Sequence, residues 1–166
     1  NTNDRGRPSP ARLAGKMAVY TVTFLAFILG GVPYVFHQLG RLLYPDSVHV
    51  WLSPGMGQHI LGVVVFALGL AGYLVCSLWL VIVGKGPFVE FDPPTQFVAT
   101  GPYRWMRNPV AALLIMTVLG EAVYFGSPGI ATLVLICPLL AHLQVTRIEE
   151  PRLRTRFGEP YEDYCR

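Results

Sequence analysis

The chain has 166 residues, which suits a single domain, and 52% of them are hydrophobic while only 14% are charged. Soluble domains carry about 25% charged residues, so this composition favours an integral membrane protein over a soluble protein with buried core helices. The net charge of +3 is not gathered into a basic stripe with interleaved aromatic residues, which argues against a nucleic-acid interface.

Two long apolar runs come first along the chain. Residues 1–16 are polar and predict a cytosolic tail, whereas the runs 17–36 and 58–83 contain no Asp, Glu, Lys or Arg. About 20 apolar residues are needed to cross the core of a bilayer. Each run therefore predicts a membrane helix.

No metal site or disulfide framework is expected. His37, His49 and His59 lie in or beside the loop between the two runs, but they are too widely spaced for a compact ligand pattern. The three cysteines, Cys76, Cys137 and Cys165, form no CxxC pair.

The second half of the chain contains two shorter apolar runs, 110–125 and 128–145, separated only by Gly126 and Ser127. They predict a tight helical hairpin that crosses the membrane thinly or stops short of the far side. The sequence as a whole thus predicts an all-α integral membrane protein, one domain over residues 1–166 with about four transmembrane helices.

Two ionisable residues lie within the shorter runs, Glu121 and His142. Such residues are candidates for contact with a substrate or cofactor because a charge in the membrane is costly. The alternatives are that Glu121 reaches water near the turn and that His142 hydrogen-bonds a neighbouring helix.

The basic residues predict the orientation, because Lys and Arg near membrane segments favour the cytoplasm. With the N-terminus inside and four crossings, all of the 13 basic residues except Arg41 fall on the cytosolic side. We therefore expect both termini, and the segments 84–109 and 146–166, in the cytosol.

The segment 84–109 is rich in Gly and Pro, and its aromatic residues argue against disorder. In its last part, Asn108 is expected to cap the next helix and Pro109 to be the first helical residue. The free N–H groups of that helix end would attract an anion, with Arg104 and Arg107 beside it. Alternatively, both arginines anchor the helix to lipid phosphates.

The segment 146–166 contains Glu149 and Glu150 where the last apolar helix leaves the membrane. They would accept hydrogen bonds from a ribose diol or balance a cationic ligand; alternatively they pair with nearby arginines at a solvated helix end. Pro151 is expected to bend or restart the helix, and Gly158 to end it. Because a hairpin joins the two cytosolic segments, we expect them to form one pocket that is open to lipid on its flank.

A family resemblance is carried by several motifs in a fixed order. These are Gly-Pro-Tyr-Arg-x-x-Arg-Asn-Pro at 101–109, Glu-Glu-Pro-x-Leu at 149–153 and Phe-Gly-x-x-Tyr-x-x-Tyr at 157–164. Together with Phe-Asp-Pro-Pro at 91–94, they resemble the isoprenylcysteine carboxyl methyltransferase and phospholipid methyltransferase superfamily. The resemblance covers about residues 84–166.

This resemblance implies S-adenosylmethionine as the cofactor. By position, the implied cofactor-binding residues are Tyr103, Arg104, Arg107, Asn108, Pro109, Glu149 and Glu150, with Arg104 and Glu150 as catalytic candidates. Family members often carry His where Asn108 stands, and Asn cannot act as a base near neutral pH.

The predicted function is methyl transfer to a lipid-like or hydrophobic acceptor that presents a carboxylate, a thiol or an amine. Two alternatives belong to other classes: a membrane-embedded NADPH-dependent reductase of the sterol-reductase kind, and a non-catalytic assembly or transport subunit. The sequence does not predict an oligomeric state.

Overall fold

The computed structural model describes residues 10–44, 55–84 and 97–165, and every regular element within these ranges is helical. The first helix is continuous and consists of α1 (Pro10–Leu25), the π-helical turn η1 (Ala26–Gly31) and α2 (Val32–Leu43). It is followed by α3 (Met56–Gly84), the 3-10 helix η2 (Gly101–Arg104), α4 (Pro109–Phe125), α5 (Pro128–Gln144), the π-helical turn η3 (Val145–Glu149), α6 (Glu150–Phe157) and α7 (Glu159–Cys165).

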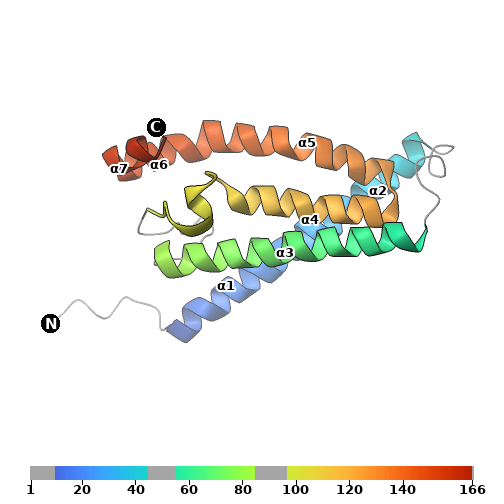
Figure 1. Cartoon of the computed structure of the whole chain (residues 1–166), viewed down its shortest axis with the longest axis horizontal. Coiled ribbons are helices and arrows are strands. Elements are labelled where there is room, and N and C mark those ends of the chain that lie inside the picture. Colours follow the sequence, from blue (N-terminus) through green and yellow to red (C-terminus); the bar gives the residue numbers. More distant parts are fainter. Residues whose placement is uncertain (1–9, 45–54, 85–96, 166) are drawn as a thin grey trace.

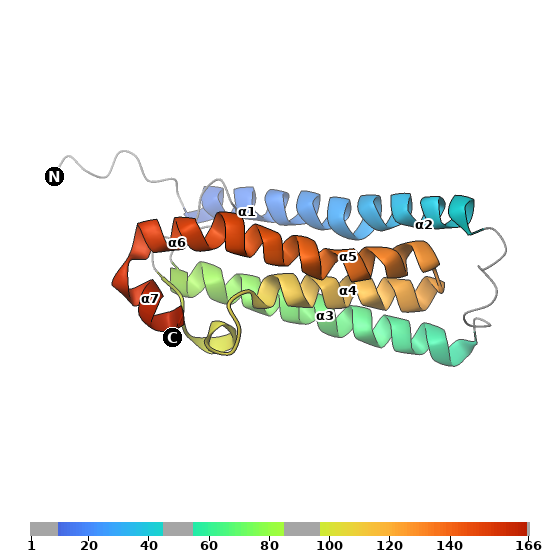
Figure 2. The same cartoon turned by 90° about the horizontal axis from the view of Figure 1, so that it is seen from above.

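The long helices lie side by side in an elongated bundle (Figures 1 and 2). The continuous helix α1–α2 crosses the bundle obliquely, with α2 packed against α5, while α3 returns and α4 and α5 run out and back. One end of the bundle therefore carries the beginning of α1 together with η2, α6 and α7. The other end carries the C-terminal end of α2 and the two residues, Gly126 and Ser127, that join α4 to α5.

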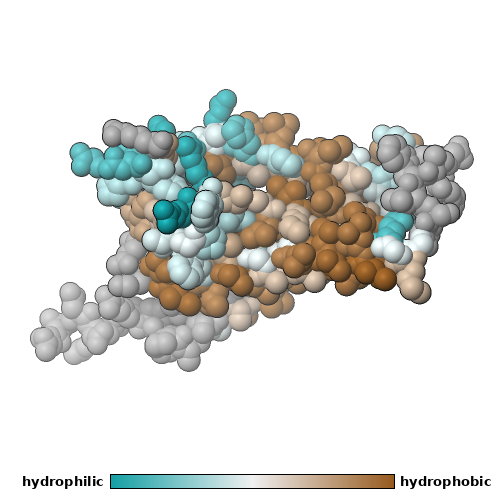
Figure 3. All heavy atoms as spheres, in the orientation of Figure 1, coloured by the Kyte–Doolittle hydropathy of each residue, from teal (hydrophilic) through white to brown (hydrophobic). Residues whose placement is uncertain are grey.

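Three helical stretches are long and apolar enough to cross a membrane: Ala18–Leu43, Met56–Gly84 and Pro128–Phe157. Large apolar side chains such as Leu42, Met56 and Leu135 face outward, where a membrane protein presents them to lipid. Figure 3 shows an apolar band along the bundle and a polar end over α6 and α7. These features confirm the prediction of an all-α integral membrane protein.

The remaining long helix, α4, has 17 residues. It is about 26 Å long, which is shorter than the bilayer core of about 30 Å. It nevertheless lies alongside α3 and α5 (Figure 2). Its position inside the bundle places its first residues, which follow Asn108, near the polar end.

Two helices extend beyond the apolar runs that predicted them. The first begins at Pro10 and continues to Leu43, so that part of the predicted tail and of the loop after residue 36 is helical. The last continues from α5 through η3 into α6. Pro33 and Pro151 do not break these helices, and each follows a π-helical turn. The wider hydrogen-bonding pattern of such a turn relieves the usual clash with the carbonyl group four residues earlier.

Small residues allow the helices to approach closely. A β-carbon on Gly69 of α3 would lie 2.6 Å from Thr117 Oγ1 of α4, and the backbones of Gly40 in α2 and Gly129 in α5 are in contact. Close packing at small residues is a main source of helix association in membranes. It fixes α4 against α3 and thereby fixes the position of the site at the beginning of α4.

Candidate active site

The segment before α4 is held against α3. Gly101 has a φ of +61°, and a β-carbon there would lie 2.5 Å from the ring of Trp79. Both its left-handed backbone and the nearby indole ring therefore require glycine. Tyr103 is buried, and its hydroxyl group donates a hydrogen bond of 3.5 Å to the carbonyl oxygen of Cys76 in α3. Burial raises the pKa of Tyr103 well above its ordinary value, so the phenol stays protonated and serves as a donor.

Helix α4 begins as the sequence predicts. Asn108 is the N-cap, with its Oδ1 accepting a 2.9 Å hydrogen bond from the backbone N–H of Ala111, and Pro109 is the first helical residue. The N-terminal end of a helix carries a partial positive charge. It faces the same polar end of the bundle as α6 and α7 (Figure 1).

The C-terminal helices fold back onto this segment through an aromatic cluster. Gly158 has a φ of +57° and ends α6, which allows α7 to turn back. The ring of Phe97 then lies 5.5 Å from Phe157, 5.7 Å from Tyr161 and 5.3 Å from Tyr164, centroid to centroid. The two tyrosine rings meet Phe97 edge to face and the Phe157 ring is tilted against it, and aromatic pairs at these distances attract each other. The cluster joins the two cytosolic segments predicted from the sequence.

Tyr164 adds a polar link between the same segments. Its hydroxyl group donates a hydrogen bond to the carbonyl oxygen of Tyr103 and lies 3.4 Å from that of Met106. Burial also raises the pKa of Tyr164, which keeps this donor protonated. Tyr164 is absent from the site residues predicted above. The signal for it was its place as the last residue of the Phe-Gly-x-x-Tyr-x-x-Tyr motif.

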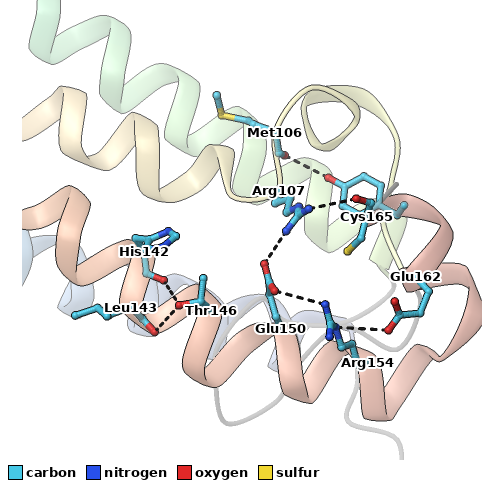
Figure 4. A network of polar contacts seen from close by, with 10 residues as sticks. Met106, Arg107, His142, Leu143, Thr146, Glu150, Arg154, Glu162 and Cys165 are labelled. Carbon is cyan, nitrogen blue, oxygen red and sulfur yellow. Dashed lines mark hydrogen bonds and ion pairs between the residues drawn. The ribbon is translucent and has the colours of Figure 1, made fainter.

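An ion pair joins Arg107, which lies just before α4, to Glu150, the first residue of α6 (Figure 4). Arg107 Nη1 lies 2.7 Å from Glu150 Oε1, and Arg107 Nη2 donates to the carbonyl oxygen of Cys165 at 3.4 Å. The hydrogen bond with Glu150 raises the pKa of Arg107. The Glu150 side chain is only 15% exposed, while that of Arg107 is 48% exposed. The pair is thus anchored on its acidic side and open to solvent on its basic side.

Glu150 has a second basic neighbour. Arg154 Nη2 lies 4.0 Å from Glu150 Oε2, and Arg154 Nε lies 3.5 Å from Glu162 Oε1. Glu150 thus pairs with an arginine of its own helix, as one of the two alternatives for the acids expects, and also with Arg107 from the other segment. The other alternative, hydrogen bonding to a ligand, stays a prediction.

The other predicted residues lie around this pair. Glu149 is half-buried, and its Oε1 accepts a 3.4 Å hydrogen bond from Gln144 Nε2. Arg104 is exposed and makes no hydrogen bond or ion pair within the part of the chain that the structure describes. Residues 85–96, which include the Phe-Asp-Pro-Pro motif, lie outside the described residues.

Glu121 and His142 lie apart from the Arg107–Glu150 pair. Glu121 is buried toward the other end of α4. His142 is exposed in α5, and its carbonyl oxygen accepts a 2.7 Å hydrogen bond from Thr146 Oγ1 (Figure 4). Neither side chain contributes to the polar network of the site.

The arrangement suits a zwitterionic ligand at the edge of a membrane. Within one cluster it offers a guanidinium group, two carboxylates, the N-terminal end of a helix and aromatic rings, next to an apolar bundle. Guanidinium groups and helix N-termini bind carboxylates, and carboxylates accept hydrogen bonds from hydroxyl and ammonium groups.

Comparison with known families agrees with this geometry. The model of the phospholipid methyltransferase family matches residues 57–160, which include α4, α5, α6 and all but the first residue of α3. Arg107, Glu150 and Arg154 lie within the match, whereas α7 after Pro160 lies outside it. Searches of curated proteins and of solved structures return no match. Because the match spans well over half of the chain, the protein belongs to the phospholipid methyltransferase family.

Proposed function

We propose that the protein is an S-adenosylmethionine-dependent methyltransferase that acts at the membrane on a lipid-like or hydrophobic acceptor. The observation that carries this proposal is the Arg107–Glu150 pair, which closes a polar cluster at one end of an apolar helical bundle. The family match supports transferase chemistry over the sterol-type reductase and the non-catalytic subunit.

The residues present fit the proposed cofactor. S-adenosylmethionine carries a carboxylate, an ammonium group, a ribose diol and a sulfonium that supplies the methyl group. Arg107 and the beginning of α4 would hold the carboxylate. Glu149 or Glu150 would accept hydrogen bonds from the ribose hydroxyls or the ammonium group. Arg107 and Glu150 bind each other at 2.7 Å. Each of them therefore already pairs with a group like the one that the cofactor would present, a carboxylate for Arg107 and a cation for Glu150.

The role of this chain in the reaction is positioning and exclusion of water, because methyl transfer is an in-line displacement. Tyr103 and Tyr164 fix the segment that carries Arg104 and Arg107. Arg104, which has no partner among the described residues, would orient the acceptor or the carboxylate of the cofactor. A carboxylate or thiolate acceptor needs no base, whereas an amine acceptor would give its proton to Glu150.

The acceptor would arrive from the bilayer on the cytosolic side. Trp105 is 85% exposed and Met106 is also exposed, so two large apolar side chains lie on the surface of the segment that precedes α4. Indole rings are enriched at the interface between a bilayer and water. We infer that this surface receives the apolar part of the acceptor.

Calorimetry on the purified protein in detergent tests the proposal. S-adenosylmethionine and S-adenosylhomocysteine should both bind saturably, and a reduced nicotinamide dinucleotide should not. Arg107→Ala and Glu150→Gln should weaken binding by about tenfold or more, since each removes a charged hydrogen-bonding partner. Arg104→Ala should weaken binding or abolish turnover.

Matched variants control for the loss of charge. Arg41→Ala removes an exposed arginine from the other end of the bundle, and Glu159→Gln changes an exposed acid in α7. Both should bind the two ligands like the parent protein. Nicotinamide binding alone would replace the proposal with the reductase, and failure of a folded protein to bind any of the three ligands would reject an enzymatic role of this site.

A further inference from the structure

A cavity lies in the half of the bundle away from the polar site. It has a volume of about 520 Å³ and is bounded by the η1–α2 region, α3, α4 and the beginning of α5. Its lining is mostly apolar and includes Leu29, Gly30, His37, Phe66, Glu121 and Tyr124. Cavities of roughly 300 to 1,000 Å³ are typical of small-molecule sites. Glu121 lies twelve residues after Pro109, about 18 Å along α4, so this cavity is separate from the methyl-transfer site.

Glu121 lines this cavity without a partner. Its side chain is 8% exposed, and Oε2 is buried with no hydrogen-bond partner among the described residues. A buried polar group that lacks a partner costs free energy, and a carboxyl group inside a membrane protein is still more costly. Three other polar side chains line the cavity, those of Tyr34, His37 and Tyr124. His37 Nδ1 lies 2.9 Å from Ser127 Oγ, the Tyr34 hydroxyl group accepts a 3.0 Å hydrogen bond from Gln38 Nε2, and none of the three reaches Glu121 Oε2. The protein thus keeps an unsatisfied carboxyl oxygen at the wall of an apolar cavity.

We propose that this cavity binds a membrane-soluble amine, a molecule with an apolar body and one protonated amino group that pairs with Glu121. The apolar walls would take the body of the ligand, and an ammonium group would supply the donor that Oε2 lacks. A diacyl phospholipid fits less well, because the cavity lining contains no Lys or Arg to face its phosphate. An anionic ligand would meet the carboxylate itself.

Photolabelling in phosphatidylcholine nanodiscs tests this assignment. The probe is a ten-carbon alkylamine with a diazirine in its chain, compared with the alcohol and the carboxylic acid that carry the same chain. The amine should label peptides that contain Gly30, Phe66 or Tyr124, and decylamine should compete. Glu121→Gln should reduce this labelling about tenfold, which is the effect of losing one charged hydrogen bond, and should leave the weaker labelling by the alcohol unchanged.

A pair of glycine variants shows whether the loss of labelling comes from filling the cavity or from adding a leucine elsewhere in the protein. A β-carbon on Gly30 would meet nothing within 4 Å, so a side chain can begin there without a clash. Gly30→Leu adds bulk at the wall of the cavity and should abolish labelling by the amine and by the alcohol. A β-carbon on Gly57 is equally unobstructed, but Gly57 does not line the cavity. Gly57→Leu should therefore leave labelling unchanged.

Each remaining outcome overturns the proposal. These outcomes are equal labelling by amine and alcohol, labelling that survives Glu121→Gln, preferential labelling by the acid, and labelling of the cavity only by an aminophospholipid probe. Thermal unfolding in detergent, measured in parallel, shows whether every variant is folded. Binding of S-adenosylhomocysteine is a separate measurement that tests the proposed methyltransferase activity, because the cavity does not include Arg107 or Glu150.

Discussion

Tyr164 shows how much of the site depends on a single side chain. Its hydroxyl group donates to the carbonyl oxygen of Tyr103 and lies near that of Met106, in the segment that carries Arg107. Tyr164→Phe keeps the aromatic contact with Phe97 but removes these polar contacts. We expect a loss of about 1 kcal/mol in the free energy of unfolding and several-fold weaker binding of S-adenosylhomocysteine, measured by thermal unfolding and by calorimetry.

The control for this variant is Tyr20→Phe, which removes an exposed hydroxyl group on α1. It should change neither quantity. If Tyr164→Phe bound the cofactor product as tightly as the parent protein does, the link between α7 and the 101–107 segment would have no part in ligand binding.

The local features of the site could be predicted from the sequence, but its contacts could not. Asn108 and Pro109 follow the rules for the beginning of a helix, which depend only on neighbouring residues. The choice of Arg107 as the partner of Glu150 depends on how α6 and α7 fold back. Several arginines close to Glu150 in the sequence carry the same charge as Arg107. Sequence spacing alone does not show whether Glu150 pairs with one of them or with an arginine in another segment.

Among the helices, α3 and α4 share the most extensive contact. A β-carbon on Gly69 would lie 2.6 Å from Thr117 Oγ1 and 2.7 Å from Thr117 N. The second atom belongs to the backbone, so the helices themselves must separate. We expect Gly69→Ala to lower the free energy of unfolding by about 1 to 3 kcal/mol, as overpacked interiors do, in a thermal unfolding assay in detergent.

Gly15→Ala is the matched variant on α1, where an added β-carbon meets nothing within 4 Å. It should be neutral or slightly stabilising, because alanine favours the helix. Equal stability of the two variants would mean that α3 and α4 are not packed as closely as described.

The helices could be predicted from the apolar runs, but their ends could not. An apolar run stops at the first polar residue, whereas a helix continues as long as its backbone hydrogen bonds are favourable. The first helix therefore includes His37 and Gln38, and the last continues through Arg147 into α6. The π-helical turns before Pro33 and Pro151 arise from the way each helix accommodates a proline, and the apolar pattern contains no sign of them.

The whole molecule is a bundle with two unlike ends. One end contains the polar cluster with Arg107 and Glu150, and the other contains the turn at Gly126 and the end of α2. The beginning of α1 and the end of α7 lie at the same end (Figure 2). The four crossings predicted from the apolar runs would account for this arrangement.

Cysteine labelling tests the orientation that the basic residues predict. In a background with Cys76→Ala and Cys137→Ala, Arg41→Cys places a thiol at the end of α2, and Cys165 supplies one at the end of α7. A maleimide that cannot cross membranes should label position 41 in intact cells of a bacterial expression host and Cys165 only after permeabilisation. Removal of Arg41 should not weaken this orientation, because Arg41 is the one basic residue that the rule places outside.

The two thiols distinguish the alternatives. Labelling of both positions in intact cells would place both ends of the bundle outside and refute the four-crossing topology. Labelling of Cys165 alone in intact cells would reverse the orientation and place the Arg107–Glu150 pair away from the cytosol. Since S-adenosylmethionine is a water-soluble cytosolic compound, that result would also contradict the proposed function. Labelling of position 41 alone in intact cells would instead place the Arg107–Glu150 pair in the cytosol, where the cofactor is found.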